Sequence, residues 1–266
     1  MDFITFGFVN GPFVILNILI NIFFIFCMVR PLHGQQIKQP LKLLLGTLIC
    51  CTMIYLLSAM LHYIFMITGY SKFMTVSFSL FVYTLYTSMS SSVWLNFFFF
   101  TQIVPAQRAS FTWIKKNIKT VIYCIWLLDK CLSLCNVNLI IGMCVMVMSS
   151  SSTVLYLCKH MHRMVAIGQP FSCSRFRSQV RVTITGILQG IMYMICAVWT
   201  VEKYFSGDVN SGYSLIQVTV INFYMMGTTF NLGAGQSAFR QRAANIWLSA
   251  TQLLKGPDVQ PAEEAG

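Results

Sequence analysis

The chain has 266 residues, of which 56% are hydrophobic and only 9% are charged, with 18 Lys and Arg against 7 Asp and Glu. A soluble domain carries about 25% charged residues, so this composition excludes a soluble globular enzyme. Its 14% of aromatic residues also excludes a disordered chain. The class that remains is an all-α integral membrane protein.

Long stretches without charge predict the membrane spans in chain order. Six stretches of 20 to 35 residues between consecutive charged residues carry no charge, and a helix needs about 20 apolar residues to cross the hydrocarbon. A seventh span must share residues 120–158 with its neighbour, close to Asp129 and Lys130. Because a charge at the bilayer centre costs about 2.5–3.5 kcal/mol, we expect either a short, tilted helix with this pair near its outer end or a chain that lacks its usual outer loop. The predicted spans are 5–29, 41–66, 75–104, 120–135, 138–158, 180–201 and 213–235.

The distribution of Lys and Arg favours seven spans over six. Cytoplasmic loops of membrane proteins collect basic residues. With seven spans and an outer N-terminus, 15 of the 18 basic residues face the cytoplasm, and the exceptions are Lys72, Lys130 and Lys203. Six spans would put two large basic clusters on opposite sides of the membrane. The sequence therefore predicts a seven-transmembrane helix bundle over 1–237 with a cytoplasmic C-terminus.

A short amphipathic helix is predicted after the last span, over 238–255. Apolar residues recur there at helical spacing beside Arg240 and Arg242; they are Phe239, Ala243, Ile246, Trp247, Ala250 and Leu254. This pattern is typical of a helix lying on the inner leaflet, and the alternative is a frayed end of the seventh span. Residues 256–266, with three acids, are predicted to be disordered.

Motifs of catalysis and cofactor binding are absent from the sequence. It contains no HExxH, GxSxG or P-loop pattern, so we expect no enzyme activity, no metal and no cofactor. His160 and His162 flank Met161, and such a pair is more often solvated than metal-bound. The net charge of +11 reflects binding to the lipid bilayer through inner-leaflet clusters, and we expect no nucleic-acid partner.

Four short motifs, in chain order, resemble the type 2 (bitter) taste receptor family of G-protein-coupled receptors. Asn21 with Phe23 and Phe24 is similar to that family's first span, and residues 95–104 (LNFFFFTQIV) to the inner end of its third. Residues 157–164 (LCKHMHRM) and 235–241 (GQSAFRQ) resemble the segments ending its fifth and following its seventh span.

The chain also departs from the family pattern at several positions. Gln102 stands where the family has Lys, Phe99 stands where it has Tyr, and residues 228–230 read TTF instead of HSF. The second outer loop is short and carries no glycosylation sequon. Divergence of this kind is expected of a fish member of the family.

The resemblance implies a plasma-membrane receptor that binds a small-molecule bitter agonist in its outer half and a heterotrimeric G protein at its inner ends. The candidate agonist contacts are Tyr83, Tyr86, Thr87, Ser90, Ser91, Trp94, Tyr193, Trp199, Gln217 and Tyr224, a mostly aromatic set with few polar anchors. The candidate G-protein-facing residues are Gln102, Lys159, His160, Arg163, Met164, Arg181 and Arg240. Anchoring to the inner leaflet explains the basic ones equally well. A vomeronasal type 1-like chemoreceptor and a small membrane transporter or channel are the alternative functions.

Overall fold

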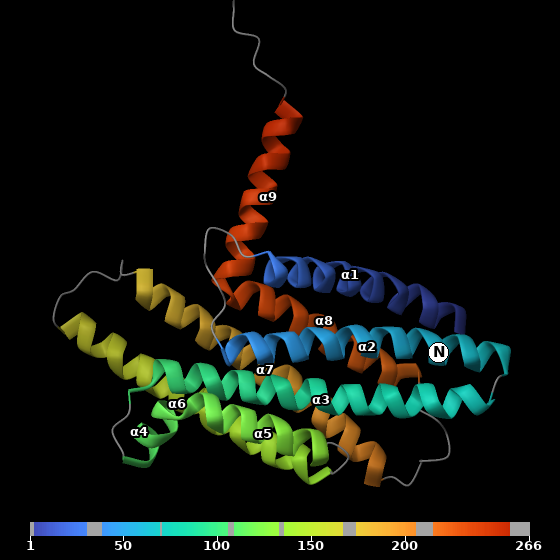
Figure 1. The fold of residues 1–266 in the computed structure, drawn as a ribbon, viewed down its shortest axis with the longest axis horizontal. Helices are drawn as coiled ribbons and strands as arrows, with labels where there is room; N and C mark the ends of the chain where they lie inside the picture. The colour runs from blue at the N-terminus through green and yellow to red at the C-terminus, as the bar shows by residue number, and fades with distance from the viewer. Residues whose placement is uncertain are drawn as a thin grey trace, which may run out of the picture.

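The computed structural model describes residues 3–30, 39–69, 71–105, 109–132, 136–166, 174–205 and 215–255. Within these residues every regular element is an α-helix (Figure 1), which confirms the predicted all-α class. The helices are α1 (Phe3–Val29), α2 (Leu41–Thr68), α3 (Ser71–Ile103), α4 (Ala109–Lys116), α5 (Ile118–Leu132), α6 (Asn136–Ala166), α7 (Ser174–Phe205), α8 (Leu215–Gly235) and α9 (Ser237–Lys255).

Each predicted span coincides with a helix, but several helices extend beyond the predicted ends. The largest differences are at α6, which continues to Ala166, and at α7, which begins at Ser174. Charged residues mark the edge of the hydrocarbon, and a helix can continue past that edge into the headgroup region. The eight-residue α4 was not predicted. The predicted disordered segment 256–266 lies outside the described residues.

The fourth predicted span is the shortest. Its helix α5 has 15 residues, which corresponds to about 22 Å at 1.5 Å per residue. Asp129 and Lys130 fall in its last turn, as expected from the sequence, although their side chains lie outside the described set. A helix of this length cannot match the hydrocarbon thickness of about 30 Å without local adjustment of the bilayer.

Four helices contain a stretch that is long and apolar enough to cross a membrane: Gly7–Val29, Leu41–Phe65, Leu139–Ala166 and Arg177–Glu202. Many of their apolar side chains are directed outward, and Phe8, Leu155 and Ile195 are 81%, 71% and 58% exposed. Exposed apolar surface of this extent is foreign to a water-soluble monomer and matches a lipid environment. The structure therefore supports a helical membrane protein.

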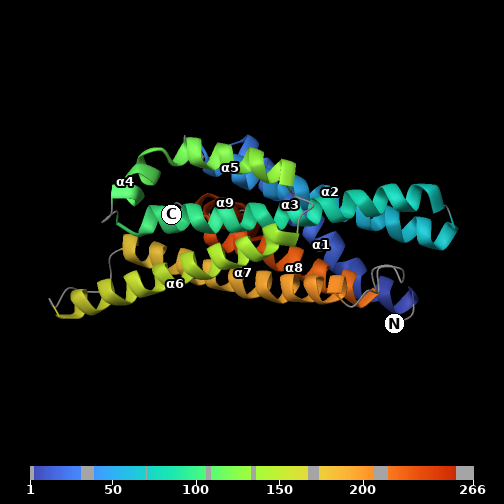
Figure 2. The same cartoon turned by 90° about the horizontal axis from the view of Figure 1, so that it is seen from below.

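The helices form a closed bundle. Each of α1, α2, α3, α6, α7 and α8 packs against the next, and α8 packs back against α1. α3 also contacts α7 across the interior, whereas α5 lies on the outside against α3 (Figure 2). Sequential helices of the bundle run in alternating directions, so that α3, α6 and α8 end where α2, α5 and α7 begin (Figure 1). We call this end of the bundle the basic end, because Lys159, Arg163, Arg181 and Arg240 lie near it.

Two hydrophobic clusters fill the interior. The cluster nearer the basic end joins α1, α2, α3, α5, α8 and α9 and includes Phe24, Leu48 and Ile122. The other joins α1, α2, α3, α6, α7 and α8 around Tyr55, Met89 and Tyr193. Hydroxyl and amide side chains are buried between them, most densely along α3. α3 can therefore be more polar than α1 or α2, because its neighbours shield it from lipid.

A row of asparagines joins the first bundle helix to the last. Asn222 Nδ2 donates to Asn10 Oδ1 at 2.8 Å, and Asn10 Nδ2 donates to Thr219 Oγ1 at 3.0 Å. About three turns further along α1, Asn21 Nδ2 reaches Thr229 Oγ1 at 3.4 Å. Amide groups in a membrane need such internal partners, because lipid tails offer none.

α9 projects away from the bundle and does not run along the other helices (Figure 1). Its first turn is anchored, because Phe239 is 1% exposed and stacks on Phe24 of α1 with ring centroids 4.4 Å apart. Arg242 donates to the Arg30 carbonyl oxygen and lies over the Phe26 ring. Beyond this point Trp247 is 71% exposed. A helix that leaves the bundle in this direction and exposes apolar side chains can lie along the membrane surface.

Replacing Phe239 by alanine is expected to release α9 from α1, because it removes a buried aromatic side chain and its stacking partner. Trypsin should then cleave after Arg240 and Arg242 several times faster in nanodisc-embedded protein. Trp247→Ala, on the exposed part of the same helix, is the matched control and should leave this cleavage rate unchanged. Equal rates for Phe239→Ala and the unchanged protein would show that the stack does not hold α9.

Candidate functional site

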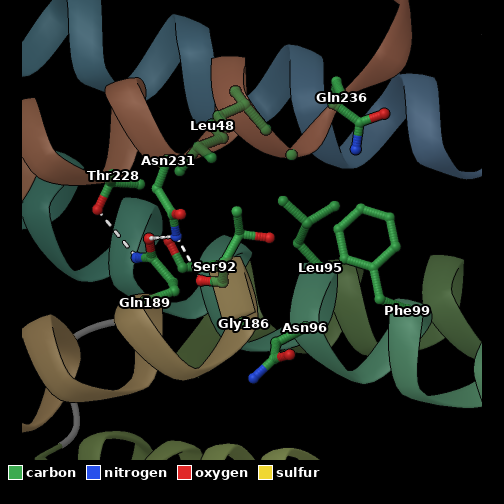
Figure 3. Close-up of a pocket in the computed structure, with 13 residues that line it drawn as sticks. Leu48, Ser92, Leu95, Asn96, Phe99, Gly186, Gln189, Thr228, Asn231 and Gln236 are labelled. Atoms are coloured by element: carbon green, nitrogen blue, oxygen red, sulfur yellow. Dashed lines mark hydrogen bonds between the residues drawn. The ribbon is translucent and has the colours of Figure 1, made fainter. Parts of the chain in front are cut away.

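A buried hydrogen-bond network centred on Gln189 links α7 to α8. The Gln189 Nε2 group donates to Thr228 Oγ1 at 2.9 Å and to the Tyr224 hydroxyl at 3.4 Å. Asn231 Nδ2 donates in turn to Gln189 Oε1 at 3.3 Å (Figure 3). The Tyr224 hydroxyl also donates to Ser92 Oγ of α3 at 3.3 Å. We call these five residues the polar latch, because together they tie α7 and α8 to α3.

The polar latch borders a small cavity near the basic end. The cavity encloses about 40 Å³, which has room for water-sized molecules but not for the 300–1,000 Å³ of a drug-sized ligand. Latch residues line one side, and Leu95, Phe99 and Gln236 line the other (Figure 3). In this arrangement the cavity beside the polar latch is therefore too small to hold an agonist.

Glycines allow the helices around the cavity to approach closely. A Cβ atom on Gly186 of α7 would lie 2.8 Å from Asn96 Oδ1 of α3, and one on Gly235 would lie 3.2 Å from Thr185 Oγ1. The Asn96 amide is positioned by its own hydrogen bond to Ser150 Oγ of α6 at 3.0 Å. Small residues at such crossings bring helix backbones together, and here they place α3, α6, α7 and α8 around one point.

The seven residues predicted to face a G protein all lie near the basic end. Gln102, Lys159 and Arg163 are exposed, whereas His160, Met164, Arg181 and Arg240 are half-buried. They come from the last turns of α3 and α6, the first turns of α7 and the start of α9. The structure thus brings them to one end of the bundle.

Arg240 has a structural role in this group. Its Nη1 donates to the carbonyl oxygens of Ala234 at 2.6 Å and of Gly235 at 3.2 Å. These carbonyls end α8 and have no partner within the helix, so a cation caps them favourably. Burial lowers the pKa of the Arg240 guanidinium from its ordinary value, and the charge of Arg181 lowers the pKa further. Both cations therefore crowd the junction of α7, α8 and α9.

The ten predicted agonist contacts are not brought together around one cavity. Tyr83 and Thr87 line a groove on the outer face of α2, α3 and α5. Ser91 is buried and donates to the Thr87 carbonyl at 2.8 Å, and Ser90 is half-buried beside it. Tyr86 packs against the cluster around Tyr55, and Trp94 packs against the cluster around Leu48.

The remaining four predicted contacts belong to α7 and α8. Tyr193 is 1% exposed and donates to the Leu139 carbonyl at 3.1 Å, and Tyr224 belongs to the polar latch. Trp199 and Gln217 lie near the ends of α7 and α8 opposite the basic end. Gln217 is 4% exposed, and Trp199 Nε1 is buried without a hydrogen-bond partner among the described residues.

Sequence reasoning missed most of the polar latch. Of its members only Tyr224 was a candidate, while Ser92, Gln189, Thr228 and Asn231 were not. A signal was present, because Gln189 and Asn231 are amides inside long apolar stretches. Such groups are expensive in lipid unless they find a partner on another helix, and they therefore mark inward-facing positions.

Neither of two comparisons with known proteins found a match for the chain. A scan against protein-family models found no family that matches the chain, and a search of curated proteins found no similar sequence. The resemblance to type 2 taste receptors thus depends on the four sequence motifs.

Proposed function

We propose that the chain is a seven-pass membrane receptor, with α1, α2, α3, α5, α6, α7 and α8 as the spans. The alternating helix directions support this topology, because they put the start of α1 and the end of α8 at opposite ends of the bundle. The basic end faces the cytoplasm, since Lys and Arg gather on that side. α9 then lies along the inner leaflet, and the N-terminus is extracellular.

The receptor responds to a small-molecule bitter agonist and activates a heterotrimeric G protein. The polar latch carries this proposal, because it is a neutral, breakable connection between α3, α7 and α8 beside the basic end. Separation of α7 from α8 would enlarge the small cavity into a cleft open to a partner. The agonist must bind the open arrangement more tightly than the closed one, since equal affinity shifts no population.

Agonist binding is assigned to the half of the bundle away from the basic end. Trp199 and Gln217 are the strongest candidates of the ten predicted contacts, because both lie near the far ends of the helices that the latch connects. The buried Trp199 Nε1, without a partner among the described residues, offers a hydrogen bond to a ligand. Binding there would act on α7 and α8 directly.

Calcium imaging with a panel of bitter compounds tests the proposal. The chain is co-expressed with a promiscuous G-protein α subunit, and a response to at least one compound is expected. The same cells without that subunit are the control and should stay silent. Ligand-evoked current that persists without the G protein would overturn the receptor proposal in favour of a channel. N- and C-terminal tags that are both accessible in intact cells would overturn the seven-pass topology.

A further inference from the structure

An open groove crosses the outer face of the bundle between α2, α3 and α5, with Met28 of α1 at its edge. Its volume is about 530 Å³, within the range of ligand-binding pockets. α2 contributes Gly46, Cys50 and Ile54 from one helical face, and the missing side chain at Gly46 deepens this wall. The groove is distinct from the polar latch and from the helix ends proposed to bind the agonist.

Contacts of α5 define the side wall of the groove. Trp126 Nε1 donates to Thr47 Oγ1 of α2 at 3.1 Å, and the Tyr123 hydroxyl donates to Gln39 Oε1 at 3.3 Å. The helix is much shorter than α2 or α3, so it covers only part of their length (Figure 2). The groove consequently opens sideways, toward the lipid.

Thr87 lines the groove, and its buried hydroxyl group has no hydrogen-bond partner among the described residues. Threonines in helices ordinarily bond back to their own backbone, as Thr84 does to the carbonyls of Leu80 at 2.8 Å and Phe81 at 3.0 Å. Thr87 is 3% exposed, yet its Oγ1 has no hydrogen-bond partner among the described residues. A buried hydroxyl in this state favours a ligand that supplies the missing bond.

Lys42 supplies a positive charge where the groove reaches the basic end. The ring centroids of Tyr55 and Phe81 lie 4.8 Å apart. These two residues of the antiparallel helices α2 and α3 therefore lie at the same height along the bundle axis. Thr87, six residues further along α3, is therefore about 9 Å nearer the basic end, level with about residue 49 of α2. The backbone of Lys42 lies about 10 Å beyond that level. The wall between the two polar groups is largely apolar.

We propose that this groove binds a long-chain anionic amphiphile of the bilayer that carries a second hydrogen-bonding group part-way along its chain. The acidic group pairs with the Lys42 ammonium at the membrane surface, the chain lies along the α2 face, and the inner polar group bonds to Thr87 Oγ1. A hydroxylated fatty acid has this chemistry. The proposal requires a membrane-embedded chain but is independent of G-protein coupling.

Binding of three radiolabelled probes to the full chain in phosphatidylcholine nanodiscs tests the proposal. 12-Hydroxystearate carries both polar groups, stearate lacks the hydroxyl, and methyl 12-hydroxystearate lacks the charge. We expect 12-hydroxystearate to bind roughly three- to tenfold more tightly than stearate. This ratio of affinities corresponds to the net free energy of one hydrogen bond. Empty nanodiscs give the background of simple partitioning.

Two substitutions separate the roles of the two groups. Thr87→Val should reduce 12-hydroxystearate binding to the level of stearate and leave stearate binding unchanged, which also reports that the variant is folded. Lys42→Gln should weaken both acids by roughly twofold to fivefold and leave the ester unaffected. Thr84→Val, whose hydroxyl is already bonded, and Lys159→Gln, outside the groove, are the matched controls and should bind like the unchanged protein.

Three outcomes would overturn the proposal. The first is binding of 12-hydroxystearate no greater than to empty nanodiscs. The second is an equal loss of 12-hydroxystearate and stearate binding in Thr87→Val, which would indicate a general distortion of the groove. The third is a loss in Thr84→Val as large as that in Thr87→Val, which would show that the free hydroxyl has no special role.

Discussion

Replacing Gln189 by leucine is expected to raise agonist-independent signalling strongly. The substitution removes three hydrogen bonds between α7 and α8. At about 0.6 kcal/mol for each interhelical bond in a membrane, the loss is about 2 kcal/mol. This corresponds to a roughly 30-fold shift of the equilibrium toward the open arrangement. Basal calcium or inositol phosphate production, divided by the amount of the protein at the cell surface, measures the effect.

Threonine substitutions on the two helices provide the comparison for Gln189→Leu. Thr228→Val removes one latch bond and should raise basal signalling by roughly threefold. Thr200→Val is the matched control, because the Thr200 hydroxyl donates to the Cys196 carbonyl of its own helix at 2.7 Å, and it should have no effect. If Gln189→Leu reaches the cell surface at normal levels without a rise in basal signalling, the polar latch does not hold the resting arrangement.

Gly142→Ala is expected to destabilise the bundle, although alanine is the better helix former by about 1 kcal/mol. A Cβ at Gly142 of α6 would lie 2.5 Å from Tyr193 Oη of α7 and 3.2 Å from Val93 Cγ2 of α3. Overpacking of a tight core costs about 1–3 kcal/mol, so the melting temperature should fall by several degrees. Unfolding followed with a thiol-reactive dye in detergent or nanodiscs measures the shift.

A second substitution tests the cause of this destabilisation. Tyr193→Phe alone removes the hydrogen bond to the Leu139 carbonyl and should cost about 0.6 kcal/mol. Combined with Gly142→Ala it should recover part of the lost stability, because the clashing oxygen is gone and the two effects are coupled. Gly190→Ala is the control, since its Cβ would meet only Ser150 Oγ at 3.8 Å. Strictly additive losses in the double variant would show that the Tyr193 hydroxyl is not the obstacle.

The helical class and the helix positions could be predicted from the sequence because charge is expensive in lipid. Charge-free stretches located six of the predicted spans, the distribution of Lys and Arg added the one at α5, and the periodic apolar residues after Gly235 located α9. Helix ends were less accurate, as at Ala166 and Ser174, because the transition from lipid to headgroups does not break the backbone hydrogen-bond ladder. α4 escaped detection because its eight residues lie among Lys and Arg.

The orientation of α3 could not be predicted from the sequence. Hydroxyl and aromatic residues occur around its whole circumference, so no polar stripe distinguishes one face. Ser92 and Asn96 face α8 and α6, whereas Tyr83 and Thr87 line the lipid-facing groove. The cause is its central place, since a helix surrounded by neighbours buries several faces at once. The packing of α5 on α2 and α3 also depends on long-range contacts that periodicity does not report.

The asparagine row between α1 and α8 has a consequence for biosynthesis. Asn10 and Asn21 enter the membrane with the first helix, but their partners Thr219, Asn222 and Thr229 are translated about two hundred residues later. Until then these amides are left with substitute partners or water, because lipid tails provide none. The bundle can close only when α8 has been synthesised, so a ribosome that stalls before α8 leaves the Asn10 and Asn21 amides of the first helix without these partners and open to recognition by the cell's quality-control machinery.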